Sequence, residues 1–172
     1  MRIRRTVWRH VPAGTEPLHI GWIEMARGRW NTQRPRLACL YTAFTQAGAV
    51  AEYRKHHIDA GLADSCRTQP RDLVSIHVDV DPVLNLTDRV ELERRGLTAV
   101  ALTGPRRTAY PLCHRIAQEA VAAGYRAILA PSAALPGERV LLVYPESSHG
   151  RLLLRNGPER IPLDLGTAPI VP

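Results

Sequence analysis

The chain has few cysteines and no long apolar run, and both absences restrict the kind of protein it can be. Its 172 residues include only Cys39, Cys66 and Cys113, and no two are spaced as Cys-x-x-Cys. This odd number argues against a disulfide framework and a structural zinc site, so we expect buried, reduced thiols. No apolar run approaches the roughly 20 residues of a membrane span. The charged start, MRIRRTVWRH, is not followed by the apolar stretch of a secretory signal, so we expect a cytoplasmic protein without membrane attachment.

Several common enzyme motifs are also missing. The sequence has no Gly-x-Gly-x-x-Gly or Walker pattern, so neither common nucleotide-binding fold is indicated. It has no Gly-x-Ser-x-Gly nucleophile elbow. His56 and His57 are adjacent and therefore point to different sides of a helix, and no His-x-x-x-His or His-Glu-x-x-His pair exists. We predict no metal site.

Positive charge is what the sequence has in excess. The net charge is +7, and Lys55 is the only lysine among the basic residues. An arginine-rich protein favours anionic partners, either nucleic acid or a small molecule that carries phosphate. The stretches RIRRTVWR and RGRW place arginine beside tryptophan, which suits phosphates and stacked bases. Because no helix-turn-helix, RNP or zinc-knuckle pattern accompanies them, a basic nucleic-acid-binding module remains only an alternative.

Apolar patterning predicts strands and helices that do not alternate regularly, which is typical of an α+β protein. Expected strands include TVWRHV, RLACLYTA (36–43), AILAP (127–131), RVLLVYP (139–145) and RLLLR (151–155). In DLVSIHVDV (72–80), the apolar face is Val74, Ile76, Val78 and Val80, and the polar face is Ser75, His77 and Asp79. We predict one domain over residues 1–172, with a core at about 8–155 and a C-terminal tail over 156–172.

Capping residues mark three expected helices. Thr45 suits the N-cap of a helix over 45–57. Asp88 and Glu91 have the spacing of a capping box, and Gly96 would end that short helix. In the helix that starts at Tyr110, Pro111 suits the first position and Gly124 the end. The buried stripe expected for that last helix is Leu112, Ile116 and Ala120.

Two polar residues stand out as candidates for chemistry. A glutamate within a helix is usually solvated, but Glu52 lies among the small residues of GAVAEY and could point inward. A buried carboxylate needs a partner or a function. Ser132 follows a predicted strand end, where site residues are common, although most such serines only stabilise a turn.

Four elements in order resemble the RES domain family. They are GRWN (28–31), LYTA (40–43), AVAE (49–52) and YPLCHRIAQEAVAAGYRAILAPSA (110–133), and the resemblance extends from about Trp8 to Tyr144. The arginine, glutamate and serine after which the family is named match Arg29, Glu52 and Ser132. Many members have a small residue where this chain has Arg27, which makes Arg27 a weaker candidate.

The resemblance implies a fold like that of ADP-ribosyltransferases, with mixed sheets and flanking helices. It also implies a bacterial toxin that degrades NAD+ and releases nicotinamide, by phosphorolysis or hydrolysis. NAD+ would be a substrate, inorganic phosphate a possible co-substrate, and no cofactor is implied. The implied partner is an Xre-like helix-turn-helix antitoxin, through which alone the toxin would meet DNA. A toxin homodimer within that complex is also implied.

Roles for individual residues follow from this chemistry as expectations. Arg29 would hold the pyrophosphate, together with Arg27, and Glu52 would stabilise the oxocarbenium-like transition state. Tyr41 would stack on nicotinamide or ribose, and Ser132 would hydrogen-bond one of them. Asn31 would fix the turn beside the substrate, and Trp30 would belong to the core. A protein ADP-ribosyltransferase would use the same residues, so the sequence leaves the acceptor open.

Overall fold

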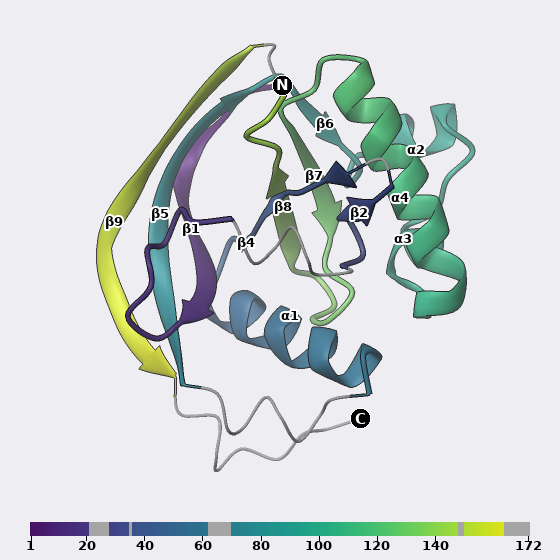
Figure 1. Ribbon diagram of the computed structural model, residues 1–172. Coiled ribbons are helices and arrows are strands. Elements are labelled where there is room, and N and C mark those ends of the chain that lie inside the picture. Colours follow the sequence, from purple (N-terminus) through teal and green to yellow (C-terminus); the bar gives the residue numbers. More distant parts are fainter. Residues whose placement is uncertain (21–27, 35, 62–69, 148–149, 164–172) are drawn as a thin grey trace.

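One mixed sheet of seven strands forms the framework of the molecule (Figure 1). The computed structural model describes residues 1–20, 28–34, 36–61, 70–147 and 150–163. The strands follow the spatial order β6-β7-β8-β4-β1-β5-β9, and every neighbouring pair is antiparallel except β6 and β7. Their bounds are β1 Ile3–Pro12, β4 Leu40–Ala43, β5 Arg71–Asp81, β6 Val83–Asn85, β7 Ala127–Pro131, β8 Arg139–Val143 and β9 Arg151–Leu163. A separate short pair joins β2 Thr32–Gln33 to β3 Arg36–Leu37.

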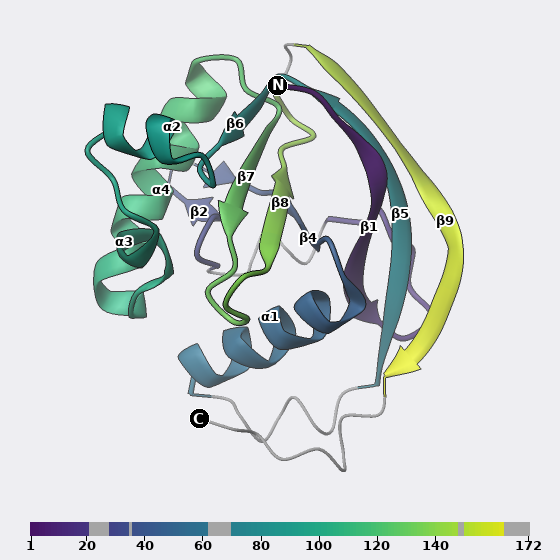
Figure 2. The ribbon, with the colours of Figure 1, turned by 180° about the vertical axis from the view of Figure 1, so that it is seen from behind.

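Helices flank the sheet on two sides. Between the parallel strands β6 and β7 the chain forms α2 (Arg89–Arg94), α3 (Ala99–Thr103) and α4 (Arg106–Ala122), because parallel neighbours need a long crossover connection. These helices cover the β6–β8 part of the sheet, and α1 (Gln46–Asp59) lies below it (Figures 1 and 2). The predicted α+β architecture, a mixed sheet with flanking helices, is confirmed.

The sheet curves so strongly that its two halves pack against each other. Val7 of β1 and Ile76 of β5 share one apolar cluster with Leu141 of β8 and Leu129 of β7. A second cluster lies on the other side of β7 and β8, where Ile116 and neighbouring α4 residues pack. Burial of apolar area on both sides of the central strands stabilises the fold. Among the described residues, no helix is long and apolar enough to span a membrane.

The helix that carries Glu52 begins where the sequence predicts. Thr45 is extended and its side-chain oxygen accepts a hydrogen bond from the Gly48 backbone nitrogen at 3.0 Å, as an N-cap does. Ala49 and Tyr53 are the buried apolar residues of α1 and are spaced one turn apart. They pack toward the sheet and hold the helix axis in place.

The start of α4 differs from the prediction. The helix begins at Arg106 after Pro105, so Pro111 lies inside it instead of at its first position. A helical proline removes the hydrogen bond to the carbonyl four residues earlier, here that of Arg107. Arg107 is exposed, so water can bond that carbonyl. Gly124, at φ +87°, ends the helix as predicted.

Packing also shifts the buried stripe of α4. Ile116 and Ala120 are buried as predicted, but Leu112 is only half-buried. The stripe instead includes Ala109, Tyr110, Cys113 and Ala117.

The predicted capping box of α2 forms only in part. Asp88 caps the helix by accepting from the Val90 nitrogen at 2.8 Å, but the Glu91 carboxylate binds Arg94 and Arg95 instead of the start of the helix. Gly96, at φ +63°, ends the helix as predicted.

The C-terminal strand covers much of the polar face predicted for 72–80. Only His77 of the three expected polar residues is exposed; Ser75 and Asp79 are buried. The Ser75 hydroxyl accepts from the Glu159 nitrogen at 3.1 Å, and Asp79 binds Arg151 of β9. The strand predicted at 151–155 continues to Leu163, so residues 156–163 belong to the sheet and not to a tail.

The predicted strand at 36–43 is split. Arg36–Leu37 pairs with β2, and Leu40–Ala43 belongs to the main sheet.

Candidate active site

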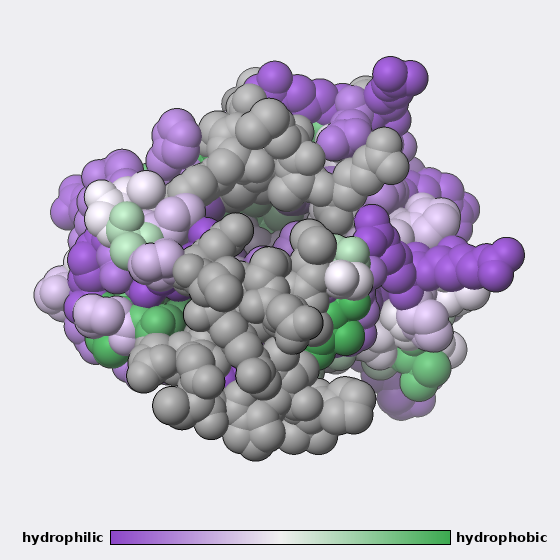
Figure 3. Space-filling view, turned by 60° about the horizontal axis from the view of Figure 1, so that its bottom comes forward, coloured by the Kyte–Doolittle hydropathy of each residue, from purple (hydrophilic) through white to green (hydrophobic). Residues whose placement is uncertain are grey.

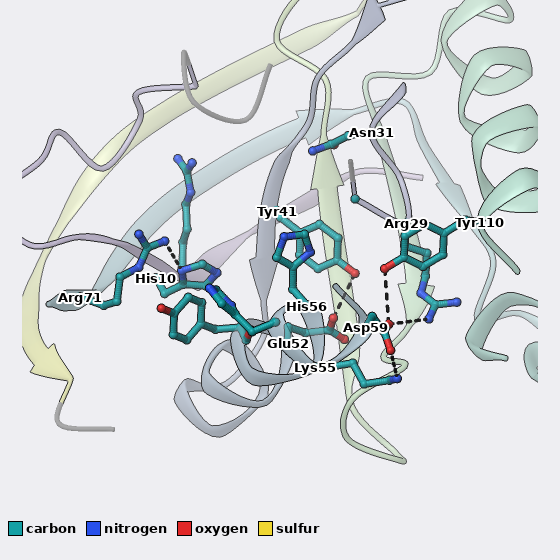
Figure 4. A pocket seen from close by; sticks show the side chains of 14 residues that line it. His10, Arg29, Asn31, Tyr41, Glu52, Lys55, His56, Asp59, Arg71 and Tyr110 are labelled. Carbon is teal, nitrogen blue, oxygen red and sulfur yellow. Dashed lines mark hydrogen bonds and ion pairs between the residues drawn. The ribbon is translucent and has the colours of Figure 1, made fainter. Parts of the chain in front are cut away.

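Four of the sequence candidates, Arg29, Asn31, Tyr41 and Glu52, line one cavity of about 280 Å³ beside α1 (Figure 4). Arg29 precedes β2, Tyr41 lies on β4, and Glu52 lies in the middle of α1. The remaining lining residues are Arg9, His10, Gly28, Tyr53, Lys55, His56, His57, Asp59, Arg71 and Tyr110. Figure 3 shows that the described side chains on the lower face of the molecule are mostly hydrophilic.

Hydrogen bonds fix the carboxylate of Glu52 from two sides. The Ser132 hydroxyl donates to Oε1 at 2.6 Å, and the Tyr41 hydroxyl donates to Oε2 at 3.2 Å. Ser132 is itself held, since its oxygen accepts from the backbone nitrogens of Ala134 and Leu135. The structure therefore brings Glu52 and Ser132 together, and Ser132 supports the carboxylate at the end of β7. A hydrogen bond from Ser132 to nicotinamide or ribose stays a prediction.

Burial raises the pKa values of both ionisable groups in this cluster. It raises the pKa of Glu52 above its usual range, although the hydrogen bonds from Ser132 and Tyr41 oppose the change. Burial, together with the nearby Glu52 charge, also raises the pKa of Tyr41 well above its usual value. Tyr41 therefore remains a protonated donor to the carboxylate.

Arg29 is buried and largely committed to the protein. Its Nη1 donates to the carbonyl oxygens of Leu102 and Gly104, at 2.9 and 3.0 Å. Its Nη2 lies 3.8 Å from the Asp59 carboxylate and has no hydrogen-bond partner among the described residues. An end-on bidentate contact to a pyrophosphate, through both terminal nitrogens, would require Nη1 to give up these carbonyl oxygens. Nη1 thus positions the segment that carries Arg29, and Nη2 is the terminal nitrogen left for a ligand. Contact of Arg29 with the pyrophosphate stays a prediction.

Asn31 and Trp30 stabilise the segment that carries Arg29. The Asn31 side-chain oxygen accepts from the Cys39 backbone nitrogen at 3.2 Å and from its thiol at 2.8 Å. Trp30 is 1% exposed, so its predicted place in the core is confirmed. Contact of Asn31 with a substrate stays a prediction, and Arg27 lies outside the described residues.

A second charged cluster next to Arg29 was missed from the sequence. Asp59 accepts from Lys55 at 2.6 Å and from the Tyr110 hydroxyl at 3.4 Å. Burial and the Asp59 charge raise the pKa of Tyr110 to about 12. Glu52, Lys55 and Asp59 recur at three- and four-residue spacing, which places them on one face of the helix. This helical spacing to Glu52 is the sequence pattern from which Lys55 and Asp59 could have been predicted.

The other end of the cavity contains His10 and Arg71, which the sequence also gave no reason to choose. Arg71 donates to Nδ1 of His10 at 2.9 Å, so this nitrogen acts as an acceptor and the ring is neutral. Burial and the neighbouring Arg71 charge lower the pKa of His10 well below its usual value. In the described part of the chain, no group of three His, Cys, Asp or Glu residues is placed to hold a metal.

Two comparisons with known proteins give a match, one with a solved structure and one with a family model. The chain resembles a chain in the crystal structure of the M. tuberculosis MbcT–MbcA toxin–antitoxin complex, with a TM-score of 0.70 and 22% identity. The match covers 94% of this chain and 85% of that one. No curated protein matches the sequence. The sequence model of the RES domain matches residues 2–164. This chain therefore belongs to the RES domain family.

Proposed function

We propose that this protein is the toxin of a toxin–antitoxin pair and that it degrades NAD+, releasing nicotinamide. The observation that carries the proposal is the Glu52 carboxylate, which lines the cavity and is held by Tyr41 and Ser132. NAD+ offers an anionic pyrophosphate, and the cavity is rich in basic residues, among them Arg9 and Arg71. Family membership and the fold of the similar toxin–antitoxin chain support the same reading.

The geometry suits cleavage of the bond between ribose C1′ and nicotinamide. As that bond breaks, its electron pair leaves with nicotinamide and positive charge develops on the ribose. A fixed carboxylate at this position stabilises the charge without reorganisation during the reaction. Two of the roughly four lone-pair directions of Glu52 accept from Ser132 and Tyr41, so others remain for the ribose or the incoming nucleophile.

The second half of the reaction passes ADP-ribose to an acceptor. A phosphate oxygen or a water oxygen would form the new bond to C1′. When the acceptor is water, one proton must leave it, and the raised pKa of Glu52 makes this carboxylate a competent base. Phosphate, as an anion, attacks without that proton transfer.

The proposed antitoxin is an Xre-like helix-turn-helix protein that covers the cavity of a dimeric toxin. The net charge of +7 favours an acidic antitoxin segment, because complementary charge speeds association and selects the partner.

Phosphorus NMR of the purified chain with NAD+, with and without inorganic phosphate, tests the proposal. Loss of NAD+ only with phosphate, giving phosphorylated ADP-ribose, would identify a phosphorylase. Loss in both samples, giving ADP-ribose, would identify a glycohydrolase. Unchanged NAD+ in both samples, from folded protein, would refute NAD+ degradation and favour protein ADP-ribosylation, which labelled NAD+ and a cell extract would reveal.

A further inference from the structure

The outer face of β1, β5 and β9 has a surplus of positive charge that the proposed reaction does not use. Thr6 of β1 pairs with His77 of β5, which pairs with Arg155 of β9. Arg4 pairs with Asp79 in the neighbouring row. Partners in register place their side chains on the same face of the sheet. A shallow hollow of about 520 Å³ lies here, and its lining includes Arg4, Thr6, His77, Asp79, Arg151 and Arg155.

The acidic residue in the described lining of the hollow, Asp79, is already paired. Asp79 accepts two hydrogen bonds from Arg2, at 2.7 and 2.6 Å, and one from Arg151 at 2.8 Å. Arg4 and Arg155 are exposed, and neither forms an ion pair within the part of the chain that the structure describes. Their guanidinium groups are therefore available to an external anion.

We propose that this face, which we call the β1–β5–β9 face, binds the phosphate backbone of a nucleic acid. Arginine suits phosphate because its planar fork can donate two parallel hydrogen bonds. Phosphate contacts of this kind are independent of sequence and release counterions, so they give affinity that depends strongly on salt. The site would position the protein on a nucleic acid without reading bases.

Nucleic acid fits this face better than an acidic protein does. The cores of protein interfaces are enriched in aromatic residues, whereas the described lining of this hollow has none. Trp8, the aromatic residue in the sequence RIRRTVWR, is half-buried and packs against Ala49 and Leu73. It is not placed to stack on bases, so backbone contacts dominate the expected binding.

The β1–β5–β9 face is distinct from the candidate active site. None of the described residues that line its hollow lines the cavity of Glu52. In Figure 1, β9 and β5 form the left side of the molecule and α4 the right. A variant of one site can therefore leave the other intact, and the two proposals can fail separately.

The test is the salt dependence of binding to a fluorescently labelled DNA duplex of arbitrary sequence. The full chain with Glu52→Gln serves as the parent, so that NAD+ degradation does not interfere with its production. The test variant adds Arg4→Gln and Arg155→Gln. The matched control adds Arg107→Gln and Arg115→Gln, which removes the same charge from two exposed positions on α4. Thermal unfolding confirms that all three proteins are folded.

We expect the test variant to bind more weakly, with a slope of log affinity against log salt that is smaller by about 2. The control should keep the slope of the parent. No duplex binding by the parent, or an equal loss in both variants, would overturn the proposal. A labelled oligoglutamate that binds as tightly and needs Arg4 and Arg155 would also overturn it, because the face would then serve an acidic protein.

Discussion

At the scale of single residues, the burial of Glu52 costs stability and serves the proposed chemistry. Burial disfavours the charged carboxylate, and the donors Tyr41 and Ser132 recover part of that loss. A carboxylate in such a position is poised to stabilise positive charge in a transition state. Active sites often contain groups of this kind, whose removal stabilises the fold while it removes function.

The first prediction concerns the stability of Glu52→Gln. Because the folded-state pKa of Glu52 is raised, its contribution to stability is complete below the unfolded pKa and is lost as pH rises through the folded pKa. Glutamine keeps the shape and does not ionise. We expect the variant to gain stability over wild type as pH rises from about 4 to 8. Denaturant unfolding measures the difference in the free energy of unfolding between the two proteins. A variant that loses stability relative to wild type toward pH 8 would contradict the prediction.

Arg29 leads to a second prediction at this scale. Arg29→Lys keeps the charge but loses the guanidinium nitrogen Nη1, which donates to both the Leu102 and the Gly104 carbonyl. Each buried carbonyl left unsatisfied costs about 1–3 kcal/mol, so we expect a clear loss in the free energy of unfolding. Arg107→Lys, at an exposed position, is the control. Equal stability of the two variants would mean that Arg29 does not brace this segment.

The sequence predicted which single residues matter better than it predicted their contacts. Trp30 was correctly placed in the core, and the small neighbours of Glu52 gave a reason to expect it to point inward. The hydrogen bond between Ser132 and Glu52 joins residues 80 positions apart, which no local pattern reveals. The commitment of Arg29 to backbone carbonyls was invisible for the same reason.

At the scale of elements, the Thr45 cap stabilises the start of α1, the helix that carries Glu52. Thr45→Ala removes the acceptor for the Gly48 nitrogen, and Thr45→Ser retains it. We expect the alanine variant to lose about 0.5–2 kcal/mol of stability and the serine variant to lose less. Well below the unfolding temperature, turnover of NAD+ should be the same in both. A large loss of turnover in a folded Thr45→Ala protein would show that the cap also tunes the site.

Element boundaries were predictable where one residue dictates them and failed where tertiary contacts decide. Thr45, Gly96 and Gly124 mark helix ends in the sequence and in the structure. Pro111 was wrongly predicted to mark the start of α4. It lies inside the helix, on an exposed turn that tolerates proline because water can bond the freed carbonyl. The polar face of β5 was misjudged because β9 covers Ser75 and Asp79. The nearest pairing partners of the two strands, Asp81 and Arg151, are 70 positions apart, so no local pattern reveals this pairing.

At the scale of the whole molecule, the thiols report on the integrity of the core. Cys39 and Cys113 are fully buried, and burial raises the pKa of each to about 12. In a Cys66→Ser background, we expect a thiol reagent at neutral pH to label neither residue until the protein opens. In denaturant both should react at once. Rapid labelling under native conditions would contradict the two-sided core.

The candidate site could not be assembled from the sequence alone, because it is a product of the fold. The cavity joins the segment before β2, strand β4, helix α1 and helix α4. Resemblance to the RES family supplied Arg29, Glu52 and Ser132. Lys55 and Asp59 were missed although their helical spacing to Glu52 was visible, whereas Tyr110 emerged only with the tertiary structure. The Tyr110 hydroxyl reaches Asp59 because α1 and α4 converge.

Release of nicotinamide from NAD+ by the wild-type chain and by Glu52→Gln, measured side by side, tests the central claim most directly. We predict steady release by the wild type and a loss of roughly 100-fold or more in the variant, because a preorganised charge has been removed. Thermal unfolding confirms that both proteins are folded. Equal rates in the two proteins, or no release by the folded wild type, would contradict the role of Glu52 in NAD+ degradation.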